Sequence, residues 1–268
     1  RRLVDIDEDL IRDWYLVEAE RGPAQAARAL AMFSGFFSWC TKQREYRDLV
    51  QRDAAKPRHL TDVLPASRSR TDALEASQLR AWFAAALEHP NRTGSTYLIG
   101  LLLTGARREE LAALKHTDVD YRWDKMKIAD KYGESRVIPL APYFKCMIQD
   151  LPVVEGNPFV FVSPGSALGR IAEPRSVLDR VLKKAGIGHV TIHGLRRSFS
   201  LLAEVAGVPA GAIAQIMGHQ PSALAERYRP RPMDVLREHM TTIEGFILQK
   251  AGVSCPSESA GLKDRGND

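Results

Sequence analysis

The sequence predicts a mainly α-helical protein with one small antiparallel β-sheet, divided into two domains. Apolar residues recur at helical spacing over most of the chain, whereas residues 117–140 alternate and contain residues that favour strands. Residues 53–72 contain two prolines and a Ser-Arg-Ser-Arg run, which is typical of an exposed connection. We therefore expect a helical domain at residues 1–65, a linker at 66–73, a larger domain at 74–250 and a polar, disordered tail at 251–268.

Composition limits the class of protein. The 268 residues are 44% hydrophobic, enough for a real core, and the net charge of +5 is compatible with binding to nucleic acid. Cys40, Cys146 and Cys255 are widely spaced, which favours reduced thiols in a cytoplasm over a disulfide framework or a zinc site. We see neither an apolar run of membrane-spanning length nor a signal peptide. Because the chain starts at Arg1 rather than Met, a further N-terminal domain stays an open question.

Two amphipathic helices are expected within residues 6–52, separated by the Gly22-Pro23 pair. Apolar side chains at helical spacing define the first, and an aromatic-rich stripe defines the second. The two stripes are Leu10, Ile11, Trp14, Tyr15 and Val17, and Ala27, Leu30, Phe33, Phe36, Phe37 and Trp39.

The expected linker is basic. Four cations in or near it would suit a chain that wraps a polyanion, and they would equally suit a solvated connector. These candidate DNA-binding residues are Lys56, Arg58, Arg68 and Arg70.

In the larger domain, helices are expected from residue 74 to about 104, at 175–186 and at 234–250, with the sheet between the first two regions. Residues 104–111 read TGARREEL, which places Arg107 at the start of a helix, with Glu110 one turn later. A hairpin follows, with Lys131 just before its turn.

Residues 191–228 bring several reactive side chains together on short helices. Thr191 is a predicted N-cap, and His193 and Arg196 lie three apart, so they share one helix face. Gly207 ends this helix.

The next helix closes at Gly218 and leaves His219 at its end. We expect a third short helix, from near Pro221, to carry Tyr228, because Pro230 forbids regular helix beyond it.

Taken in order, these motifs are TG-x-R-x-x-EL, a hairpin Lys ahead of a strand ending in Pro-Leu, H-x-x-R, Gly-His, and a Tyr nine residues later. The set resembles the tyrosine recombinases, the phage-integrase family, over roughly residues 74–250. Each motif alone is weak, but five in compatible order are specific. The resemblance implies a helical core-binding domain joined to a catalytic domain, which together form a C-shaped clamp on duplex DNA.

The resemblance also implies a role for each candidate residue. Cleaving a phosphodiester without a metal requires cations for the phosphate oxygens and a nucleophile that can leave again. The implied roles are phosphate binding by Arg107 and Arg196, nucleophilic attack by Tyr228, general acid catalysis by Lys131, base catalysis or phosphate donation by His193, a further phosphate hydrogen bond from His219, and orientation of an Arg or His by Glu110.

Several assignments have alternatives. Arg197 suits a phosphate contact or a surface charge about equally. Lys131 has Lys125 and Lys127 as neighbours, and a lysine at a turn is often merely solvated. Tyr132 and Tyr143 are weaker rival nucleophiles.

The implied function is site-specific recombination through a 3′-phosphotyrosine, to integrate or excise a phage or other mobile element. The implied partners are double-stranded DNA attachment sites, bound by a homo-tetramer that is monomeric or weakly oligomeric without DNA, and DNA-bending accessory proteins. No metal, nucleotide or other cofactor and no membrane is expected, and the protein would lie in a bacterial cytoplasm with the nucleoid. Two alternatives are a type IB topoisomerase-like relaxing enzyme and a DNA-binding regulator with an inactive site.

Overall fold

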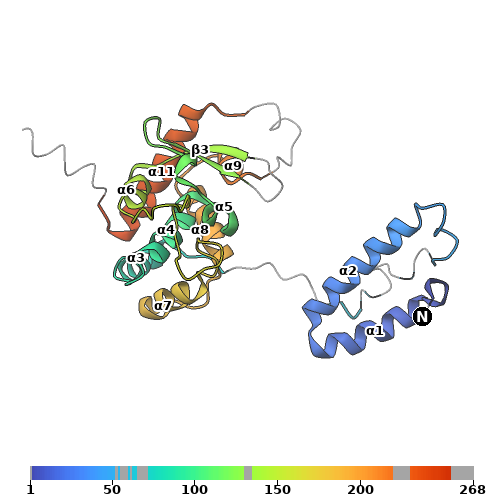
Figure 1. Ribbon diagram of the computed structural model, residues 1–268. Coiled ribbons are helices and arrows are strands. Elements are labelled where there is room, and N and C mark those ends of the chain that lie inside the picture. The colour runs from blue at the N-terminus through green and yellow to red at the C-terminus, as the bar shows by residue number, and fades with distance from the viewer. Residues whose placement is uncertain are drawn as a thin grey trace, which may run out of the picture. The chain divides into compact units, whose positions relative to one another are not determined.

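The computed structural model describes residues 2–51, 54, 60, 62–64, 72–129, 135–219 and 230–254. The chain forms two compact units, residues 1–70 and 71–268 (Figure 1). The predicted class, mainly helical with one small antiparallel sheet, is confirmed. The finer domain bounds expected from the sequence stay predictions, and the tail beyond residue 254 lies outside the described residues.

The N-terminal unit contains the two predicted helices, α1 (Glu8–Arg21) and α2 (Pro23–Cys40), after a short 3-10 turn, η1 (Leu3–Asp5). Asp7 caps α1, since its side chain accepts a hydrogen bond from the Leu10 N–H at 2.8 Å. The buried side chains between the helices come from both predicted stripes and from the chain that follows. They are Ile11, Tyr15, Ala26, Leu30 and Leu60, with a second group of Phe37, Cys40, Val50 and Ala54.

The described helices of the C-terminal unit surround one central helix. These helices are α3 (Leu79–Leu87), α4 (Arg92–Thr104), α5 (Arg108–Ala112), α6 (Pro142–Gln149), α7 (Arg175–Ala185), α8 (Ile192–Val205), α9 (Ala210–Met217) and α11 (Met233–Ala251), with 3-10 turns η3 (Ala76–Gln78) and η4 (His116–Asp118). Helix α4 is buried throughout residues 94–104 and packs against α3, α6 and α8 (Figure 1). It ends at Gly105, where a side chain would lie 2.4 Å from the Phe199 ring of α8. Only glycine therefore allows α4 and α8 to approach this closely.

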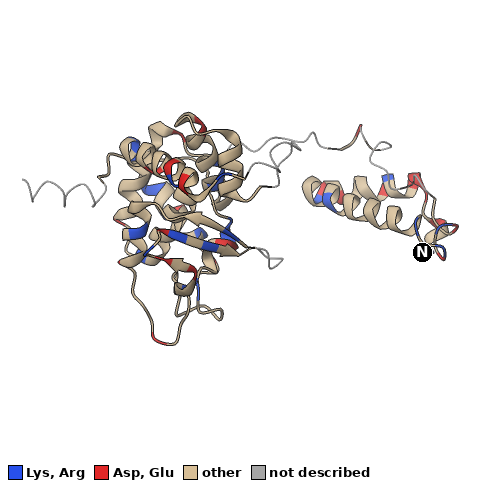
Figure 2. Ribbon diagram, turned by 90° about the horizontal axis from the view of Figure 1, so that it is seen from above, with Lys and Arg blue, Asp and Glu red and all other residues tan. Residues whose placement is uncertain are grey.

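The sheet lies where the alternating pattern predicted it. Strands β1 (Val119–Asp120), β2 (Lys125–Ala129) and β3 (Ser135–Pro139) pair antiparallel in the order β1-β2-β3. Met126 pairs with Ile138, and Ile128 pairs with Arg136. Because side chains alternate along a strand, Arg136 shares the buried face with Ile138. Basic residues on β2 and β3 appear as blue segments of the ribbon in Figure 2.

Helix α6 is the one described α-helix that the sequence pattern did not predict. It begins at Pro142, in the first-turn position that proline favours. Its first N–H groups are satisfied from far along the chain, since Tyr143 N and Phe144 N donate to the two carboxylate oxygens of Glu244 on α11 at 2.8 and 3.1 Å. Burial raises the pKa of Glu244, and these two donors oppose the rise. The last described helix is thus bonded into the core.

Among the described helices, none is both long and apolar enough to cross a membrane.

We expect Glu244→Ala to destabilise the C-terminal unit by about 1–3 kcal/mol, because two buried N–H groups lose their acceptor. Urea unfolding monitored by circular dichroism would measure this change. The matched control is Glu238→Ala on the same helix, where the side chain is exposed and the change should stay within about 0.5 kcal/mol. Equal losses in the two variants would contradict the capping role.

Candidate functional site

Three arginines from three separate segments converge on the C-terminal end of α9. Each donates to one of three successive carbonyl oxygens: Arg136 Nε to Ile216 O at 3.0 Å, Arg196 Nη2 to Met217 O at 2.9 Å, and Arg107 Nη2 to Gly218 O at 3.4 Å. The last carbonyls of a helix lack intrahelical partners and carry its partial negative charge. The arginine cluster, Arg107, Arg136 and Arg196, therefore completes this helix end and is held by it.

The turn after α9 positions His219. Gly218 is left-handed, with φ of 68°, and the His219 N–H bonds back to Ala214 O at 2.9 Å. This is the C-terminal turn that the sequence predicted. A side chain at position 218 would lie 2.8 Å from Arg136 Nη1, so glycine is required for space as well as for conformation.

Arg107 is the N-cap residue of α5, directly after the tight end of α4. Its backbone N–H and its Nη1 both donate to Glu110, at 2.9 and 2.6 Å. The Arg107 side chain nevertheless remains 46% exposed. Glu110 and Gly218 hold the two terminal nitrogens of its guanidinium, and the exposed part of the side chain is accessible to a ligand.

Glu110 is the buried anion among these cations. Its side chain is 3% exposed and also accepts from Arg136 Nη2 at 2.8 Å. Burial alone would raise the pKa of Glu110, but the hydrogen bonds from Arg136 and Arg107 outweigh it and lower the pKa to about 2. The carboxylate is therefore ionised at neutral pH and orients two arginines at once.

Helix α8 supplies Arg196 and His193 from one face. Thr191 is the N-cap, as predicted, and accepts from the Gly194 N–H at 2.9 Å. Arg196 is buried and also donates to the Gly105 carbonyl. Burial, and then the charge of Arg107, lower the pKa of Arg196 to about 10, so it remains charged at neutral pH.

Both histidines lie in this positive field. Partial desolvation, followed by the charges of Arg197 and Arg196, lowers the pKa of His193. Desolvation, followed by the charge of Arg196, also lowers that of His219. Both imidazoles are then neutral at pH 7 and are able to accept a proton.

The Arg197 side chain already bonds to another residue of the protein. It donates to the carboxylate of Asp72, which also accepts from Thr191 N at 3.0 Å and Thr191 Oγ1 at 2.6 Å. Close by, Leu74 N donates to Ser198 Oγ at 2.7 Å. The start of the C-terminal unit is thus fastened to the first turns of α8, and a DNA contact by Arg197 stays a prediction.

The structure brings Arg107, Glu110, His193, Arg196 and His219 together. The remaining predicted site residues, Lys131, Tyr228, Lys56, Arg58, Arg68 and Arg70, lie outside the described residues. Among the rivals, Tyr132 also lies outside them, Tyr143 is buried at the start of α6, Lys125 pairs with Asp120 at 3.4 Å, and Lys127 is exposed on β2.

Arg136 is the member of the cluster that sequence reasoning missed. The available signal was strand alternation, which places its charge on the same face as the buried Ile138. A charge on the buried face of a strand needs a partner, and here the partner is Glu110.

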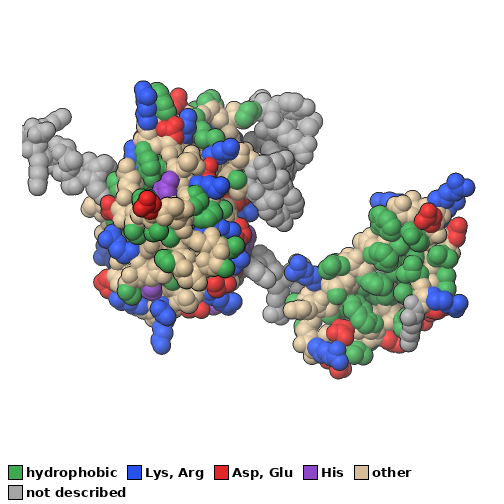
Figure 3. All heavy atoms as spheres, in the orientation of Figure 1, with side chains coloured by type: hydrophobic (Ala, Val, Ile, Leu, Met, Phe, Trp, Pro, Cys, Tyr) green, Lys and Arg blue, Asp and Glu red, His purple; other side chains and the backbone are tan. Residues whose placement is uncertain are grey.

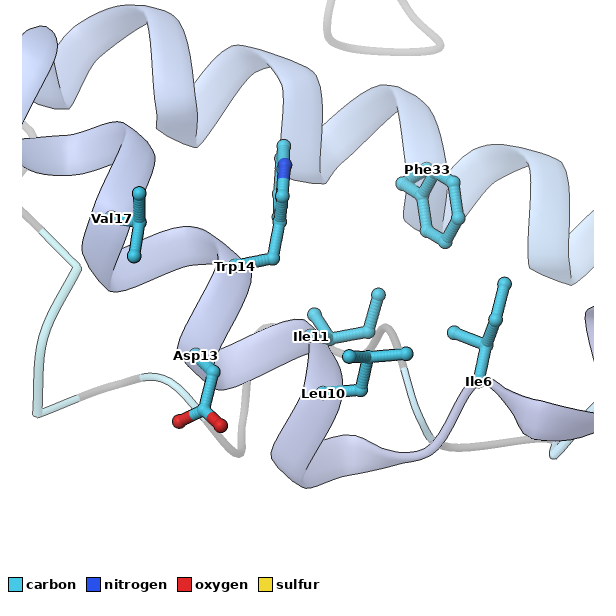
Figure 4. Close-up of a pocket in the computed structure, with 7 residues that line it drawn as sticks. All are labelled: Ile6, Leu10, Ile11, Asp13, Trp14, Val17 and Phe33. Carbon is cyan, nitrogen blue, oxygen red and sulfur yellow. The ribbon is translucent and has the colours of Figure 1, made fainter. Parts of the chain in front are cut away.

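A metal site and an enclosed small-molecule site are two other possibilities for this chain. Within the described ranges, no group of three His, Cys, Asp or Glu side chains could hold a metal ion. A hollow of about 590 Å³ lies elsewhere, in the N-terminal unit, on whose visible face hydrophobic side chains gather (Figures 3 and 4). Only Asp13 among its lining residues is ionisable, and its carboxylate is directed away from the other lining side chains (Figure 4). The lining is Ile6, Leu10, Ile11, Asp13, Trp14, Val17 and Phe33.

Chemically, the arginine cluster and the two histidines suit a phosphodiester. Guanidinium groups bind non-bridging phosphate oxygens through paired hydrogen bonds, and preorganised cations stabilise charge that develops on them. Neutral imidazoles next to such a site donate or accept hydrogen bonds. The geometry therefore suits a phosphate group, with imidazoles beside it that are able to transfer protons.

Comparison with protein families agrees with this chemistry. The sequence model described as the phage integrase core-binding domain matches residues 1–62, and the model described as the phage integrase family matches residues 72–233.

Individual proteins show the same similarity. Prophage integrase IntF of Escherichia coli (strain K12) is 42% identical over 259 residues, which cover 94% of this chain and 55% of IntF. The fold resembles the Tn1549 transposon integrase in complex with circular intermediate DNA, with a TM-score of 0.66, 18% identity and coverage of 88% of this chain and 85% of that one. It also resembles the lambda integrase tetramer bound to a Holliday junction, with a TM-score of 0.62, 18% identity and coverage of 83% and 66%.

The depressed pKa of Glu110 predicts a pH-dependent contribution to stability. Because the folded pKa of about 2 lies below the ordinary 4.5, the contribution is complete above pH 4.5 and is lost as the pH falls towards 2. We expect wild type to be more stable than Glu110→Gln at neutral pH. That difference should shrink below pH 4.5 by up to about 1.4 kcal/mol per pH unit.

Urea unfolding at a series of pH values would measure this difference. Glu109→Gln is the control, because its carboxylate is 53% exposed and its ion pairs contribute little. A pH-independent difference for Glu110→Gln would show that the carboxylate is not held ionised by its arginines.

Proposed function

Because the chain belongs to the phage integrase family, we propose that it is a site-specific DNA recombinase that cleaves and rejoins DNA through a 3′-phosphotyrosine. The reaction would integrate or excise a phage or other mobile element. The observation that carries the proposal is the arginine cluster around the end of α9, with two exposed histidines beside it whose pKa values are lowered by desolvation and by the neighbouring cations.

In this proposal Arg107 and Arg196 stabilise the negative charge on the non-bridging oxygens of the scissile phosphate. The exposure of Arg107 supports direct contact, whereas Arg196 is buried, donates to two backbone carbonyls and contributes mainly charge and position. His193 takes the proton of the nucleophile or donates to phosphate, and His219 donates a further hydrogen bond. Glu110 keeps Arg107 in place.

Tyr228 is the proposed nucleophile and Lys131 the proposed general acid for the leaving 5′-oxygen. Support for Tyr228 comes from the chain that follows it. Gln215 on α9 exchanges two hydrogen bonds with the backbone of Arg231, at 3.1 and 2.9 Å. Tyr228 is three residues before Arg231 in the sequence, and three residues of chain span at most about 11 Å. This spacing supports Tyr228 as the nucleophile of a site at the end of α9.

The energy of the broken phosphodiester is kept in the phosphotyrosine, so the proposed reaction consumes no nucleotide and needs no metal. Attack by the free 5′-hydroxyl of another strand reverses the step and releases the tyrosine. The phenolate is a good leaving group for this purpose, and the same cations stabilise both directions.

The proposed substrate is double-stranded attachment-site DNA, bound by a homo-tetramer that exchanges strands through a Holliday junction. Support comes from the solved relatives, a transposon integrase with circular intermediate DNA and a lambda integrase tetramer on a Holliday junction. The chain spans only 55% of the length of IntF, so these properties are proposed for the whole protein. A monomeric or weakly associated state without DNA, DNA-bending accessory proteins and a place with the bacterial nucleoid in the cytoplasm complete the proposal.

We predict that Tyr228→Phe abolishes covalent attachment to a nicked suicide duplex of candidate attachment DNA, because the phenolic oxygen that forms the ester is gone. DNA affinity should remain near that of wild type. Denaturing gel electrophoresis detects the adduct, and a mobility-shift assay measures binding. Tyr121→Phe, a partly exposed tyrosine next to β1, should form adduct as wild type does.

Undiminished adduct in Tyr228→Phe would refute the assignment of the nucleophile. If wild type relaxes supercoiled plasmid but does not recombine paired sites, the topoisomerase-like alternative is correct. If wild type binds DNA and forms no adduct on any candidate site, the inactive-regulator alternative is favoured.

Binding should weaken steeply with salt, because cations that neutralise phosphates release counterions from DNA. The logarithm of the association constant should fall linearly with the logarithm of salt concentration, by about 0.9 per phosphate contact. Fluorescence anisotropy with the Tyr228→Phe protein measures this without cleavage. A flat response would show that phosphate contacts do not dominate DNA binding.

A further inference from the structure

No step of the reaction proposed above is assigned to Arg136 itself, although its side chain bonds to two other segments of the site. Its side chain is 18% exposed, and Nε and Nη2 donate to Ile216 O and to Glu110. On another side it lies against Gly218, where even a Cβ atom would come within 2.9 Å of its Cζ atom. The guanidinium therefore fills the space between β3, α5 and the end of α9.

The bonds of Arg136 reach two candidate catalytic residues. Through Glu110 it fixes the carboxylate that holds the backbone and side chain of Arg107. Through Ile216 it holds the last turn of α9, three residues before His219. The planar fork of arginine makes both bonds from one rigid group, which the single ammonium of lysine cannot reproduce.

We propose that Arg136 is a positioning residue for DNA cleavage, which locks the Gly218–His219 turn and Glu110 together and so sets the places of His219 and Arg107. This inference rests on the proposed function of the site. Arg136 acts through its neighbours, because Nε and Nη2 of its guanidinium already bond to protein and most of its side chain is covered. A side chain in this position determines the rate of the chemical step more than the affinity for DNA.

The test compares wild type with two variants. Arg136→Gln loses both the positive charge and the paired N–H donors of the guanidinium. Arg136→Lys keeps the charge and loses the paired donors. Cleavage of a nicked suicide duplex of candidate attachment DNA is measured at saturating protein, so that the rate reports the bound complex. We expect both variants to cleave more slowly, on the order of 100-fold for Arg136→Gln, as for a reacting group moved by about 1 Å. Arg180→Gln, an exposed arginine on α7, is the matched control and should cleave at the wild-type rate.

Binding separates positioning from direct phosphate contact. In the Tyr228→Phe background, Arg136→Gln should leave the salt dependence of binding unchanged. A slope smaller by about 0.9 would mean that Arg136 itself neutralises a phosphate, and the proposal would be overturned. A wild-type cleavage rate in Arg136→Gln would overturn it as well.

The titration of His219, followed by NMR and assigned with a His219→Gln variant, gives a readout that needs no DNA. Because the charge of Arg136 contributes to lowering the pKa of His219, that pKa should rise in Arg136→Gln and change little in Arg136→Lys. An unchanged His219 pKa in Arg136→Gln would contradict the placement of Arg136 beside the turn that carries His219.

If wild type forms no adduct, the proposed function fails, whereas this titration still reports on the position of Arg136. If Arg136→Gln does not fold, the Arg136→Lys cleavage rate decides.

Discussion

Three guanidinium groups bonded to three consecutive carbonyls hold the end of α9, and the other features of the site depend on this interaction. The arginines arrive from β3, from α8 and from the start of α5, so one short helix end fixes the relative positions of three segments. A helix C-terminus suits this purpose, because its free carbonyls carry partial negative charge. The cations are thereby concentrated without a cluster of carboxylates that would cancel their field.

Glu110 shows how much negative charge such a centre tolerates. One buried carboxylate bonds to Arg107 and Arg136, which leaves the cluster with net positive charge. This excess positive charge contributes to lowering the pKa values of His193, His219 and Arg196. An anion that enters the site meets charge that the fold has already assembled, so little reorganisation is needed.

Local sequence signals predicted local structure well. Thr191 caps α8, Gly218 ends α9, and alternation located the sheet, because each signal depends on neighbours within a few residues. The sequence motifs also identified five residues that the structure brings together, which are Arg107, Glu110, His193, Arg196 and His219. Contacts across long separations were not: Arg136 bonds to carbonyl and carboxylate groups 80 and 26 positions away, and Asp72 meets Arg197 125 positions away. Helix α6 was missed for the same reason, since its N-terminus is capped from α11.

The bonds of Asp72 have a mechanical consequence. Asp72 is the first described residue of the C-terminal unit, and it is tied to Thr191 and Arg197 on either side of His193. Tension along the chain that joins the two units would therefore be borne by the opening turn of α8, rather than by a loose loop. Strain on this tether would act first on the helix that presents His193 and Arg196, so a pull at residue 72 and the geometry of the site share one mechanical path.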